Sequence, residues 1–331
     1  MRTRERKTPR VAVLAGGPDA EREVSLNSGR AIADAINASG RFAAGLHEIG
    51  RVSGRELGAI KADAIFPALH GGFGEGGPLQ DLLEADGRPY VGSGPGAARR
   101  AMDKVATKLA AAECGVPTAP AAVFDVRDER SWIGLPAVLK PVHEGSSVGV
   151  HLCRKRGEWD KARAAVAADM RELPGRVYMV ERLVEGEELT VGVLDPGGEH
   201  EAALDPIRIE PAAEFYDYEA KYTRDDTRYT VDPVLPAGVK GVIQKRAVTL
   251  ARALGVRHLC RVDFLLDRED NAWLLEVNTM PGFTSHSLFP MASRHAGMEM
   301  PVLCALLVEL ALRDVGKARP KRARAGKVAA R

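Results

Sequence analysis

The chain of 331 residues has few of the features that mark membrane proteins or disulfide-rich secreted proteins. It has four cysteines, Cys114, Cys153, Cys260 and Cys304, and their spacing matches neither a disulfide framework nor a metal motif. A reducing, cytoplasmic setting fits this pattern best. No window approaches the roughly 18 apolar residues of a transmembrane helix. The apolar run 11–15 is too short for a signal peptide and predicts a first buried strand instead.

An excess of one charge is also missing, because 47 basic residues stand against 45 acidic ones, for a formal net charge of +2. This balance gives no overall attraction to nucleic acid, so we predict no nucleic-acid partner and no membrane insertion. The tails 1–9 and 316–331 are nevertheless basic and poor in large apolar residues. We expect both to be solvated segments outside the packed core, with contact to nucleic acid or an anionic membrane as the weaker alternative.

The remaining composition, 45% hydrophobic and 28% charged, is that of a soluble globular protein of two or three domains. The N-terminal third alternates predicted strands and helices, which favours a parallel α/β sheet. The predicted elements are a strand at 11–17, a helix at 24–38, a strand at 64–69, a helix at 79–85 and a strand at 89–91. Functional residues gather beyond the carboxyl ends of such strands, where Gly17 and His70 fall.

Beyond residue 95 the pattern changes to a mixture of helices and further strands, with no internal repeat. The predicted helices lie at 96–114, 159–170, 239–254 and 300–313. The predicted strands lie at 137–140, 148–152, 177–184 and 189–194.

The segment 261–282 (RVDFLLDREDNAWLLEVNTMPG) predicts a two-stranded hairpin around a polar turn. If the turn centres between residues 269 and 270, Asp263 lies opposite Glu276, and Asn278 shares the face of Glu276. Like charges placed opposite each other destabilise a sheet, so the arrangement makes sense if a cation lies there. Oxygen ligands favour Mg²⁺, which binds through one or two carboxylates plus substrate phosphates. An ordinary exposed acidic hairpin is an equal alternative, and a bulge would shift the register.

The loop 143–149 (HEGSSVG) lies between two predicted strands and is typical of an anion-binding turn. Its glycines let the backbone approach a ligand closely, consecutive amides form a concavity, and Ser146 and Ser147 add hydroxyl donors. A turn without a ligand is an equal alternative, but Lys140, just before the loop, can reach a phosphate as a point charge. Lys104 is a weaker candidate, since a lysine on a helix is usually solvated.

Four further positions remain open on the residues alone. Glu181, in the apolar segment 177–184, could contribute to a base-binding strand, although a charged edge strand is the favoured alternative. Glu21 near a helix N-terminus could simply stabilise the helix dipole. A lone histidine such as His70 is more often structural than catalytic. Arg261, two residues before Asp263, could form a salt bridge or stabilise an oxyanion during acyl transfer.

Taken together, blocks of sequence over residues 10–312 resemble the D-alanine:D-alanine ligases of the ATP-grasp superfamily. In chain order, the blocks are GGPDAEREVSLNSG, ALHGGFGEGG, YVGSG, MDK, VLKPVHEGSSVGV, FYDYEAKY, RVDF and EVNTMPGFTSHSLFPM. Each block is a weak signal by itself, but their order and spacing together are specific.

The resemblance implies an α/β (α+β) three-domain ATP-grasp architecture, in which two antiparallel sheets clamp ATP. The implied domains are an N-terminal α/β domain at 10–97, a central domain at 98–187 and a C-terminal domain at 188–315 with a lid at 215–232. It also implies two D-alanine substrates, two Mg²⁺ ions with Mn²⁺ as a substitute, a cytoplasmic homodimer and a role in peptidoglycan precursor synthesis. In the implied reaction, ATP phosphorylates the first D-alanine carboxylate, and the amine of the second D-alanine attacks the acyl phosphate.

The same resemblance implies roles for individual residues. The implied magnesium ligands are Asp263, Glu276 and Asn278. The implied nucleotide contacts are Lys104, Lys140, Ser146, Ser147, Glu181, Arg182, Leu183, Glu188 and Lys221. The implied substrate contacts are Glu21, His70, Arg261, Gly282 and Ser287. Of these, Arg261 and the Gly282 amide match oxyanion stabilisers, and the lid residue Tyr222 matches a tyrosine that hydrogen-bonds toward the network of Ser146 and Glu21.

Three departures from the family pattern, Asp19, Gly76 and Cys260, touch no implied ligand and predict adjusted packing rather than lost activity. One alternative is a ligase that joins D-alanine to D-lactate. Tyr222 disfavours it, and Tyr222→Phe is expected to raise D-lactate use. The other alternative, a non-catalytic nucleotide-binding module, has no need of an oxyanion partner such as Arg261.

Overall fold

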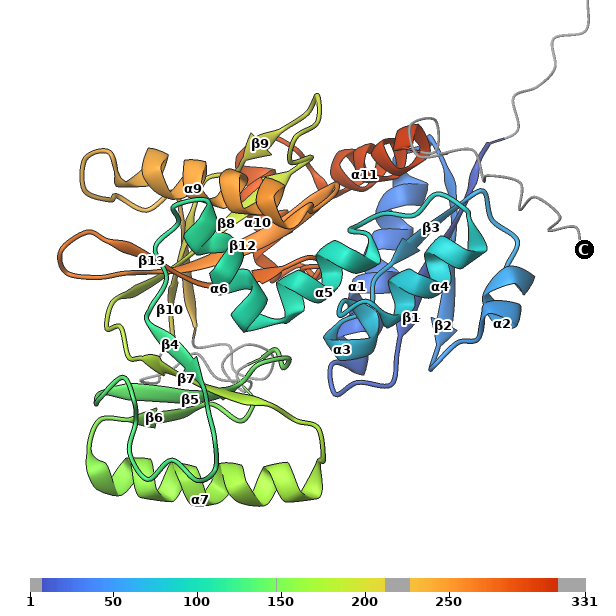
Figure 1. Ribbon diagram of the computed structural model, residues 1–331. Helices are drawn as coiled ribbons and strands as arrows, with labels where there is room; N and C mark the ends of the chain where they lie inside the picture. Colours follow the sequence, from blue (N-terminus) through green and yellow to red (C-terminus); the bar gives the residue numbers. More distant parts are fainter. Residues whose placement is uncertain (1–7, 147, 212–226, 315–331) are drawn as a thin grey trace, which may run out of the picture.

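The computed structural model describes residues 8–146, 148–211 and 227–314. They form one parallel sheet and two antiparallel sheets with helices packed around them (Figure 1). The parallel sheet lies at one end of the molecule, and the two antiparallel sheets stack at the other. This mixed α/β architecture is the fold class that the sequence predicts.

The N-terminal sheet is parallel, as the alternation of strands and helices predicts, and has the order β2-β1-β3. Its strands are β1 (Arg10–Gly16), β2 (Ala43–Ile49) and β3 (Ala64–Pro67). Its helices are α1 (Arg22–Ala38), α2 (Gly54–Ala59), α3 (Gly71–Gly74) and α4 (Pro78–Asp86). Sequence reasoning missed β2, because this partly exposed strand has no continuous apolar run. The predicted strand 89–91 is reduced to a single bridge between Ile65 and Tyr90.

The single helix predicted at 96–114 is wrong, since two helices occupy this segment. They are α5 (Pro95–Met102) and α6 (Lys104–Glu113). Asp103 separates them: its backbone is extended, and its side chain accepts hydrogen bonds from the Val105 and Ala106 amides at 2.9 and 3.0 Å. An aspartate at this N-cap position starts a new helix by satisfying its free amides. The break places Lys104 at the first position of α6.

The central sheet is antiparallel with the order β4-β7-β5-β6. Its strands are β4 (Ala121–Val123), β5 (Ala137–Pro141), β6 (His151–Cys153) and β7 (Tyr178–Arg182). Because β7 lies between β4 and β5, the edge-strand interpretation of residues 177–184 is wrong. The predicted strand 148–152 begins only at His151, since Gly149 has a φ of 69° and turns the chain.

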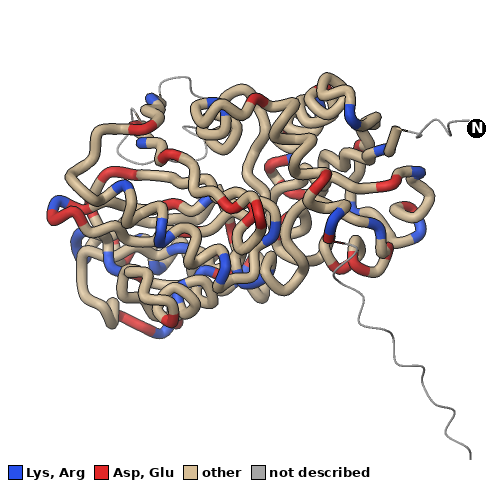
Figure 2. Tube along the Cα trace, turned by 90° about the horizontal axis from the view of Figure 1, so that it is seen from above, with Lys and Arg blue, Asp and Glu red and all other residues tan. Residues whose placement is uncertain are grey.

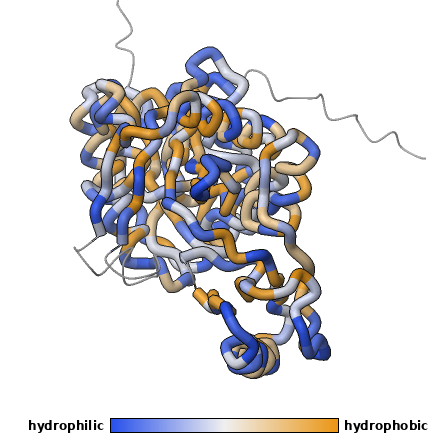
Figure 3. The backbone as a smooth tube through the Cα atoms, turned by 90° about the vertical axis from the view of Figure 1, so that its left-hand side faces the viewer, coloured by the Kyte–Doolittle hydropathy of each residue, from blue (hydrophilic) through white to orange (hydrophobic). Residues whose placement is uncertain are grey.

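One long helix, α7 (Arg156–Glu172), covers the outer face of the central sheet (Figure 1). In Figure 3 this helix is seen end-on at the lower end of the molecule. Its buried residues, Trp159, Ala162 and Val166, pack against the sheet, where Trp159 meets Phe124 edge to face. The helix therefore seals one face of the sheet and leaves the other face to the C-terminal sheet.

The C-terminal sheet is antiparallel with the order β11-β10-β8-β12-β13, and β9 pairs with β8. Its strands are β8 (Glu187–Leu194), β9 (Ala202–Ala203), β10 (Ile207–Glu210), β11 (Arg228–Val231), β12 (Leu259–Leu266) and β13 (Ala272–Asn278). The helices in this part of the chain are α9 (Val239–Leu254), α10 (Leu288–His295) and α11 (Met300–Asp314), and α11 packs against α1. Sequence reasoning found α9 and α11 but not α10.

Two hydrophobic clusters join parts that are distant in sequence. The first combines α1 with α11, and within it Phe66 and Phe283 meet edge to face with ring centroids 5.6 Å apart. The second combines Ala101 and Ala111 of α5 and α6 with β8, β12, β13 and α9. These clusters fix the N-terminal sheet and α5–α6 against the C-terminal sheet. The predicted domain boundaries stay a prediction.

The predicted hairpin is present as β12 and β13, with Asp263 opposite Glu276 and Arg261 opposite Asn278. A bulge lies between Asp263 and Phe264, so the pairing nearer the turn is shifted by one residue, with Phe264 opposite Leu274. The turn therefore centres at residue 269 rather than between 269 and 270. The bulge compensates for that difference and places the two carboxylates opposite each other.

The surface carries both charge signs, and Figure 2 shows acidic and basic residues interspersed along the trace. Within the described ranges, no single helix has the length and apolar character needed to cross a membrane. The bent pair α10 and α11 meets that test only jointly, at an angle of 104°.

Candidate active site

A cavity of about 560 Å³ lies between the central and C-terminal sheets. Its walls come from β5 and β7 on one side and from β8, β10, β12 and β13 on the other. Its volume falls within the range typical of small-molecule sites. The predicted residues that line it are Lys104, Lys140, Glu181, Arg182, Leu183, Glu188, Asp263 and Glu276.

The two opposed carboxylates of the hairpin lie on the wall of this cavity. Asp263 is only 3% exposed; Thr190 Oγ1 donates to it at 2.5 Å, and Arg261 donates from Nε and Nη2 to its two oxygens, both at 3.0 Å. Glu276 Oε2 lies 3.7 Å from Lys104 Nζ. These bonds hold both carboxylates in fixed positions, so their oxygens fit a divalent cation.

Asn278 is held differently from the two carboxylates. Its Oδ1 accepts a hydrogen bond from the Met280 amide at 3.0 Å. A carbonyl oxygen has a second lone pair, which leaves it able to serve as a ligand as well. The Met280 amide thereby orients the third predicted oxygen donor.

The predicted phosphate loop lies close to two lysines. Lys104 Nζ donates to the Glu144 carbonyl of the loop. The Glu144 side chain accepts from Arg176 at 2.8 Å, which fixes the loop against the central sheet. Lys140, at the end of β5, is buried and reaches into the cavity wall. Lys104 is buried too, contrary to the expectation of a solvated helix lysine.

Glu181 forms a buried ion-pair cluster with two lysines, one of which sequence reasoning missed. Its Oε1 contacts Lys140 Nζ, and its Oε2 lies 2.8 Å from Lys108 Nζ. Burial alone would raise the pKa of Glu181, but Lys140 and Lys108 hold it below its usual value. Burial lowers the pKa of Lys108. The signal available in the sequence is that Lys108 follows Lys104 by one helical turn, on the same face.

The segment after Glu181 offers backbone groups to the cavity. The Arg182 amide donates to the Pro120 carbonyl at 2.9 Å and the Leu183 amide to the Pro136 carbonyl at 3.1 Å. These two amides are therefore engaged, and the carbonyl oxygens are what this stretch can offer to a ligand. Glu188 lies across the cavity on β8, where a carboxylate suits sugar hydroxyls.

A second group of polar residues gathers where the N-terminal sheet meets the hairpin. Glu21 is the N-cap residue of α1, and its Oε1 accepts a hydrogen bond from Ser146 Oγ at 2.6 Å. His70 Nδ1 lies 3.1 Å from the Met280 carbonyl and must donate to it, which makes Nε2 the unprotonated nitrogen of a neutral ring. Burial lowers the pKa of His70, which favours that neutral form.

His70 Nε2 is buried and has no hydrogen-bond partner among the residues that the structure describes. A buried polar atom without a partner is costly, which points to a ligand that supplies a donor. An unprotonated nitrogen near the Glu21 carboxylate suits an ammonium group, because both are acceptors. This is the observation that favours a substrate role over a structural role for His70.

Glu75, another buried residue near this group, was missed by sequence reasoning. Its carboxyl accepts from the Gly71 amide at 3.2 Å. Burial first, and then the charge of Glu21, raise the pKa of Glu75 to about 8. Glu75 is therefore protonated near neutral pH. An isolated Gly-Glu-Gly sequence carries no signal of such burial.

Gly282 and Ser287 lie together after the hairpin. A Cβ atom at Gly282 would lie 2.7 Å from Ser287 Oγ, so only glycine fits without displacement. Ser287 Oγ accepts from the Thr284 amide at 2.9 Å, and the neighbouring Phe283 amide donates to Ser28 Oγ at 3.1 Å. The turn is thereby pinned to α1. Three predicted site residues, Ser147, Lys221 and Tyr222, lie outside the described residues.

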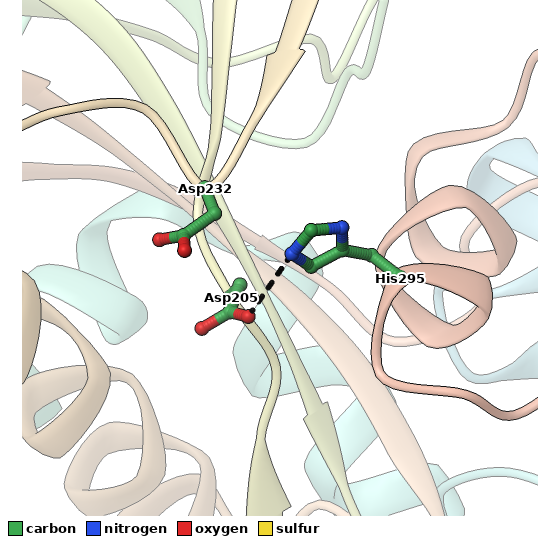
Figure 4. A group of neighbouring side chains, drawn as sticks. All are labelled: Asp205, Asp232 and His295. Carbon is green, nitrogen blue, oxygen red and sulfur yellow. Dashed lines mark ion pairs between the residues drawn. The ribbon is translucent and has the colours of Figure 1, made fainter.

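A separate cluster of Asp205, Asp232 and His295 has ligand atoms close enough to hold a metal ion (Figure 4). However, Lys240 Nζ lies 2.6 Å from Asp205 and 2.7 Å from Asp232. His295 Nε2 lies 3.6 Å from Asp205. The lysine ammonium already supplies the positive charge, so this cluster is an ion-pair network on the surface.

Comparison with known proteins agrees with the geometry. The family model described as "D-ala D-ala ligase C-terminus" matches residues 119–309. A D-alanine–D-alanine ligase of Dechloromonas aromatica is 44% identical over 92% of this chain and 98% of its own length. One of Stutzerimonas stutzeri is 41% identical over 91% of this chain and 93% of its own length.

Solved structures of similar fold include two ligases. The D-alanine–D-alanine ligase of Bacillus anthracis complexed with ATP has a TM-score of 0.77 and 28% identity, covering 94% of this chain and 99% of that one. The VanG D-Ala:D-Ser ligase of Enterococcus faecalis has a TM-score of 0.80 and 27% identity, covering 92% of this chain and all (100%) of that one.

Proposed function

Because this chain belongs to the D-alanine:D-alanine ligase family, we propose that it joins two D-alanines at the expense of ATP, for peptidoglycan precursor synthesis. The observation that best supports this proposal is that one hairpin borders both parts of the site, the proposed nucleotide cavity and the proposed amino-acid site. Asp263 and Glu276 line the cavity, while His70 Nδ1 lies 3.1 Å from the carbonyl of Met280, two residues after the second strand of the hairpin. A nucleotide and an amino acid can therefore meet at this hairpin.

ATP occupies the cavity between the two antiparallel sheets in this proposal. Lys104, Lys140 and the loop around Gly145 bind the phosphates, and Glu188 binds the ribose. The carbonyls of Arg182 and Leu183 are suited to the amino group of adenine, because both adjacent amides are already engaged. Trp273, Leu274 and Leu275 supply an apolar wall.

Asp263, Glu276 and Asn278 are the residues that would hold Mg²⁺, with Mn²⁺ as a substitute and two ions expected. The bound ions would neutralise phosphate charge during transfer. The donor set supports this assignment, because it consists of oxygens only and includes two carboxylates held directly opposite each other on adjacent strands.

The first D-alanine would bind through its ammonium group, which donates to Glu21 and to His70 Nε2. Its carboxylate oxygen then attacks the γ-phosphorus of ATP, the bond to ADP breaks, and D-alanyl phosphate forms. Alignment of the two reactants supplies most of the acceleration in such a transfer, because little covalent chemistry is required of the protein.

The second D-alanine would bind with its carboxylate near Ser287. Its neutral amine attacks the acyl carbonyl, and the tetrahedral intermediate releases phosphate and D-alanyl-D-alanine. In this proposal, Arg261 and the Gly282 amide would stabilise the oxyanion of that intermediate. Most of the lid predicted at 215–232 lies outside the described residues, and exclusion of water from the acyl phosphate by this segment stays a prediction.

The proposal also specifies the second substrate, which we take to be D-alanine. A D-lactate ligase is the alternative from the sequence, and the similarity to a D-Ala:D-Ser ligase structure makes D-serine a further one. We also propose a cytoplasmic homodimer, whose oligomeric state can be measured by light scattering.

The competing idea of a non-catalytic module is tested by comparing ATP binding with phosphate release. If the protein is a ligase, ADP and phosphate are released only when D-alanine is present. The module predicts that ATP binds and that D-alanine leaves phosphate release at the background rate. Glu276→Gln serves as a matched variant, because it keeps the shape of the site and removes the charge of one predicted metal ligand.

A further inference from the structure

The Glu181 carboxylate is paired with two lysine ammonium groups, although one would balance its charge. It is 6% exposed, and each of its carboxylate oxygens contacts a different lysine, Lys108 and Lys140. One carboxylate between two ammonium groups leaves the buried cluster with a net charge of about +1. Such a charge is costly inside a protein unless a ligand neutralises it. The cluster therefore favours a negatively charged ligand group next to Lys140, the member of the cluster that lines the cavity.

The two lysines differ in how they are held. Lys108 Nζ lies 2.8 Å from Glu181 and donates to Thr118 Oγ1 at 2.7 Å and to the Ala119 carbonyl at 2.9 Å. An ammonium has three protons, so all the donors of Lys108 are satisfied. Lys108 is not among the residues that line the cavity, whereas Lys140 is. Lys108 is the fixed member of the cluster, and Lys140 is the member that can reach a ligand.

Helix α6 explains how two lysines come to have such different positions. Asp103 caps the helix and places Lys104 in its first turn, next to the phosphate loop. Lys108 follows one turn later on the same face and reaches under β7 to Glu181. One helix thus supplies a lysine to the loop and a second lysine to the carboxylate beside it.

We propose that Lys108 is a positioning residue for the nucleotide: it remains paired with Glu181 and so allows Lys140 to turn from Glu181 to the phosphates. Without Lys108, Glu181 would be paired with Lys140 alone. A phosphate would then have to compete with the buried Glu181 carboxylate for Lys140. If the phosphate bound Lys140, the Glu181 carboxylate would be left without a counter-charge. Breaking a buried ion pair in this way is strongly unfavourable.

This inference rests on the proposed function, because it requires ATP in the cavity. The direct test is calorimetric titration of the full-length protein with ATP and with adenosine, which lacks phosphates. Lys108→Met removes the charge and keeps the length of the side chain. We expect its affinity for ATP to fall about tenfold or more, while its affinity for adenosine stays that of the wild type. In steady-state kinetics the loss should appear in the KM for ATP rather than in kcat.

Two further variants keep the test decisive if Lys108→Met folds poorly. Lys108→Arg keeps the charge and should retain most of the ATP affinity. Glu181→Gln removes the carboxylate, so adding Lys108→Met to it should cause no further loss of ATP affinity. Neutralising both partners of a buried pair is also better tolerated than removing one.

The outcomes separate the inference from the proposed function. Absence of ATP binding by the wild-type protein would overturn the proposed function itself. Normal ATP affinity of Lys108→Met would overturn the inference alone, and so would an equal loss of ATP and adenosine affinity, which indicates a structural role. A further loss of ATP affinity when Lys108→Met is added to Glu181→Gln would overturn it as well.

Discussion

Ser146 Oγ donates a hydrogen bond of 2.6 Å to Glu21 Oε1, although the two residues are 125 positions apart in the chain. Ser146 belongs to the loop that Lys104 contacts, where we propose that phosphates bind, and Glu21 is the N-cap residue of α1 in the N-terminal part. The bond connects the loop proposed to bind phosphates with the residue proposed to bind the first D-alanine. In the proposed reaction it would fix the distance between the D-alanine carboxylate and the γ-phosphate.

Loss of this bond should affect the first D-alanine most. A hydrogen bond to a charged group contributes about 1.5–3 kcal/mol, so Ser146→Ala is expected to raise the KM for D-alanine by about tenfold or more. Steady-state kinetics at saturating ATP measures the effect. Ser285→Ala removes a hydroxyl at an exposed position that takes no part in this bond, so it is the control and should leave the KM unchanged. An unchanged KM for D-alanine in Ser146→Ala would show that this bond does not contribute to binding of the first D-alanine.

The metal assignment predicts a dependence on magnesium concentration. Glu276→Gln replaces a charged ligand by a neutral one, so turnover should fall by orders of magnitude at low Mg²⁺ through lost metal affinity. Raising the Mg²⁺ concentration should recover part of the loss. Glu269→Gln, in the exposed turn of the same hairpin, is the control. Near-normal activity of Glu276→Gln at low Mg²⁺ would refute the assignment.

Arg261 is predicted to act through the shape of its guanidinium group as well as its charge. It forms a two-pronged contact with Asp263, with both bonds at 3.0 Å, which a lysine cannot reproduce. Arg261→Lys should therefore lower kcat by about a hundredfold, the order found for loss of an oxyanion donor. Arg268→Lys, on the exposed turn, should have no effect. Wild-type kcat in Arg261→Lys would show that charge alone is sufficient.

The raised pKa of Glu75 predicts that the stability of the folded protein depends on pH. Its pKa is raised from 4.5 to about 8, chiefly by burial, so between these values the folded protein binds more protons than the unfolded chain. Stability should therefore fall as the pH rises through this window. Glutamine stays neutral, so the melting temperature of Glu75→Gln should gain on that of the wild type as the pH is raised from about 5 to about 8. If the melting temperatures of the two proteins change with pH in parallel, Glu75 is ionised in the folded protein.

The hairpin shows how far local patterns predict a site. Period-two alternation placed Glu276 and Asn278 on one face, and an assumed turn centre placed Asp263 opposite Glu276, a pair that the structure confirms. The centre of the turn was wrong by half a residue, and a bulge restored the register. Both features depend on turn geometry and on pairing with β8, which alternation does not encode.

Other errors have their cause in tertiary contacts. The helix predicted at 96–114 has good helical propensity throughout, but Asp103 caps a second helix within it. Lys108 and Glu75 were missed because their burial depends on β7 and on the N-terminal helices, which are distant in sequence. Glu181 was assigned to an edge strand because strand order cannot be derived from the segment alone. Ordinary charged residues become functional candidates only once these neighbours are in place.

The central claim is tested most directly by identifying the product and counting it against ATP consumed. The purified protein is incubated with ATP and Mg²⁺ plus D-alanine alone, or D-alanine with L-alanine, D-serine or D-lactate. We expect D-alanyl-D-alanine from D-alanine alone, with one ADP and one phosphate formed per dipeptide. We also expect D-alanyl-D-alanine to remain the main product in every mixture. Preferred formation of the D-serine or D-lactate product, or ATP binding without any dipeptide, would contradict the central claim.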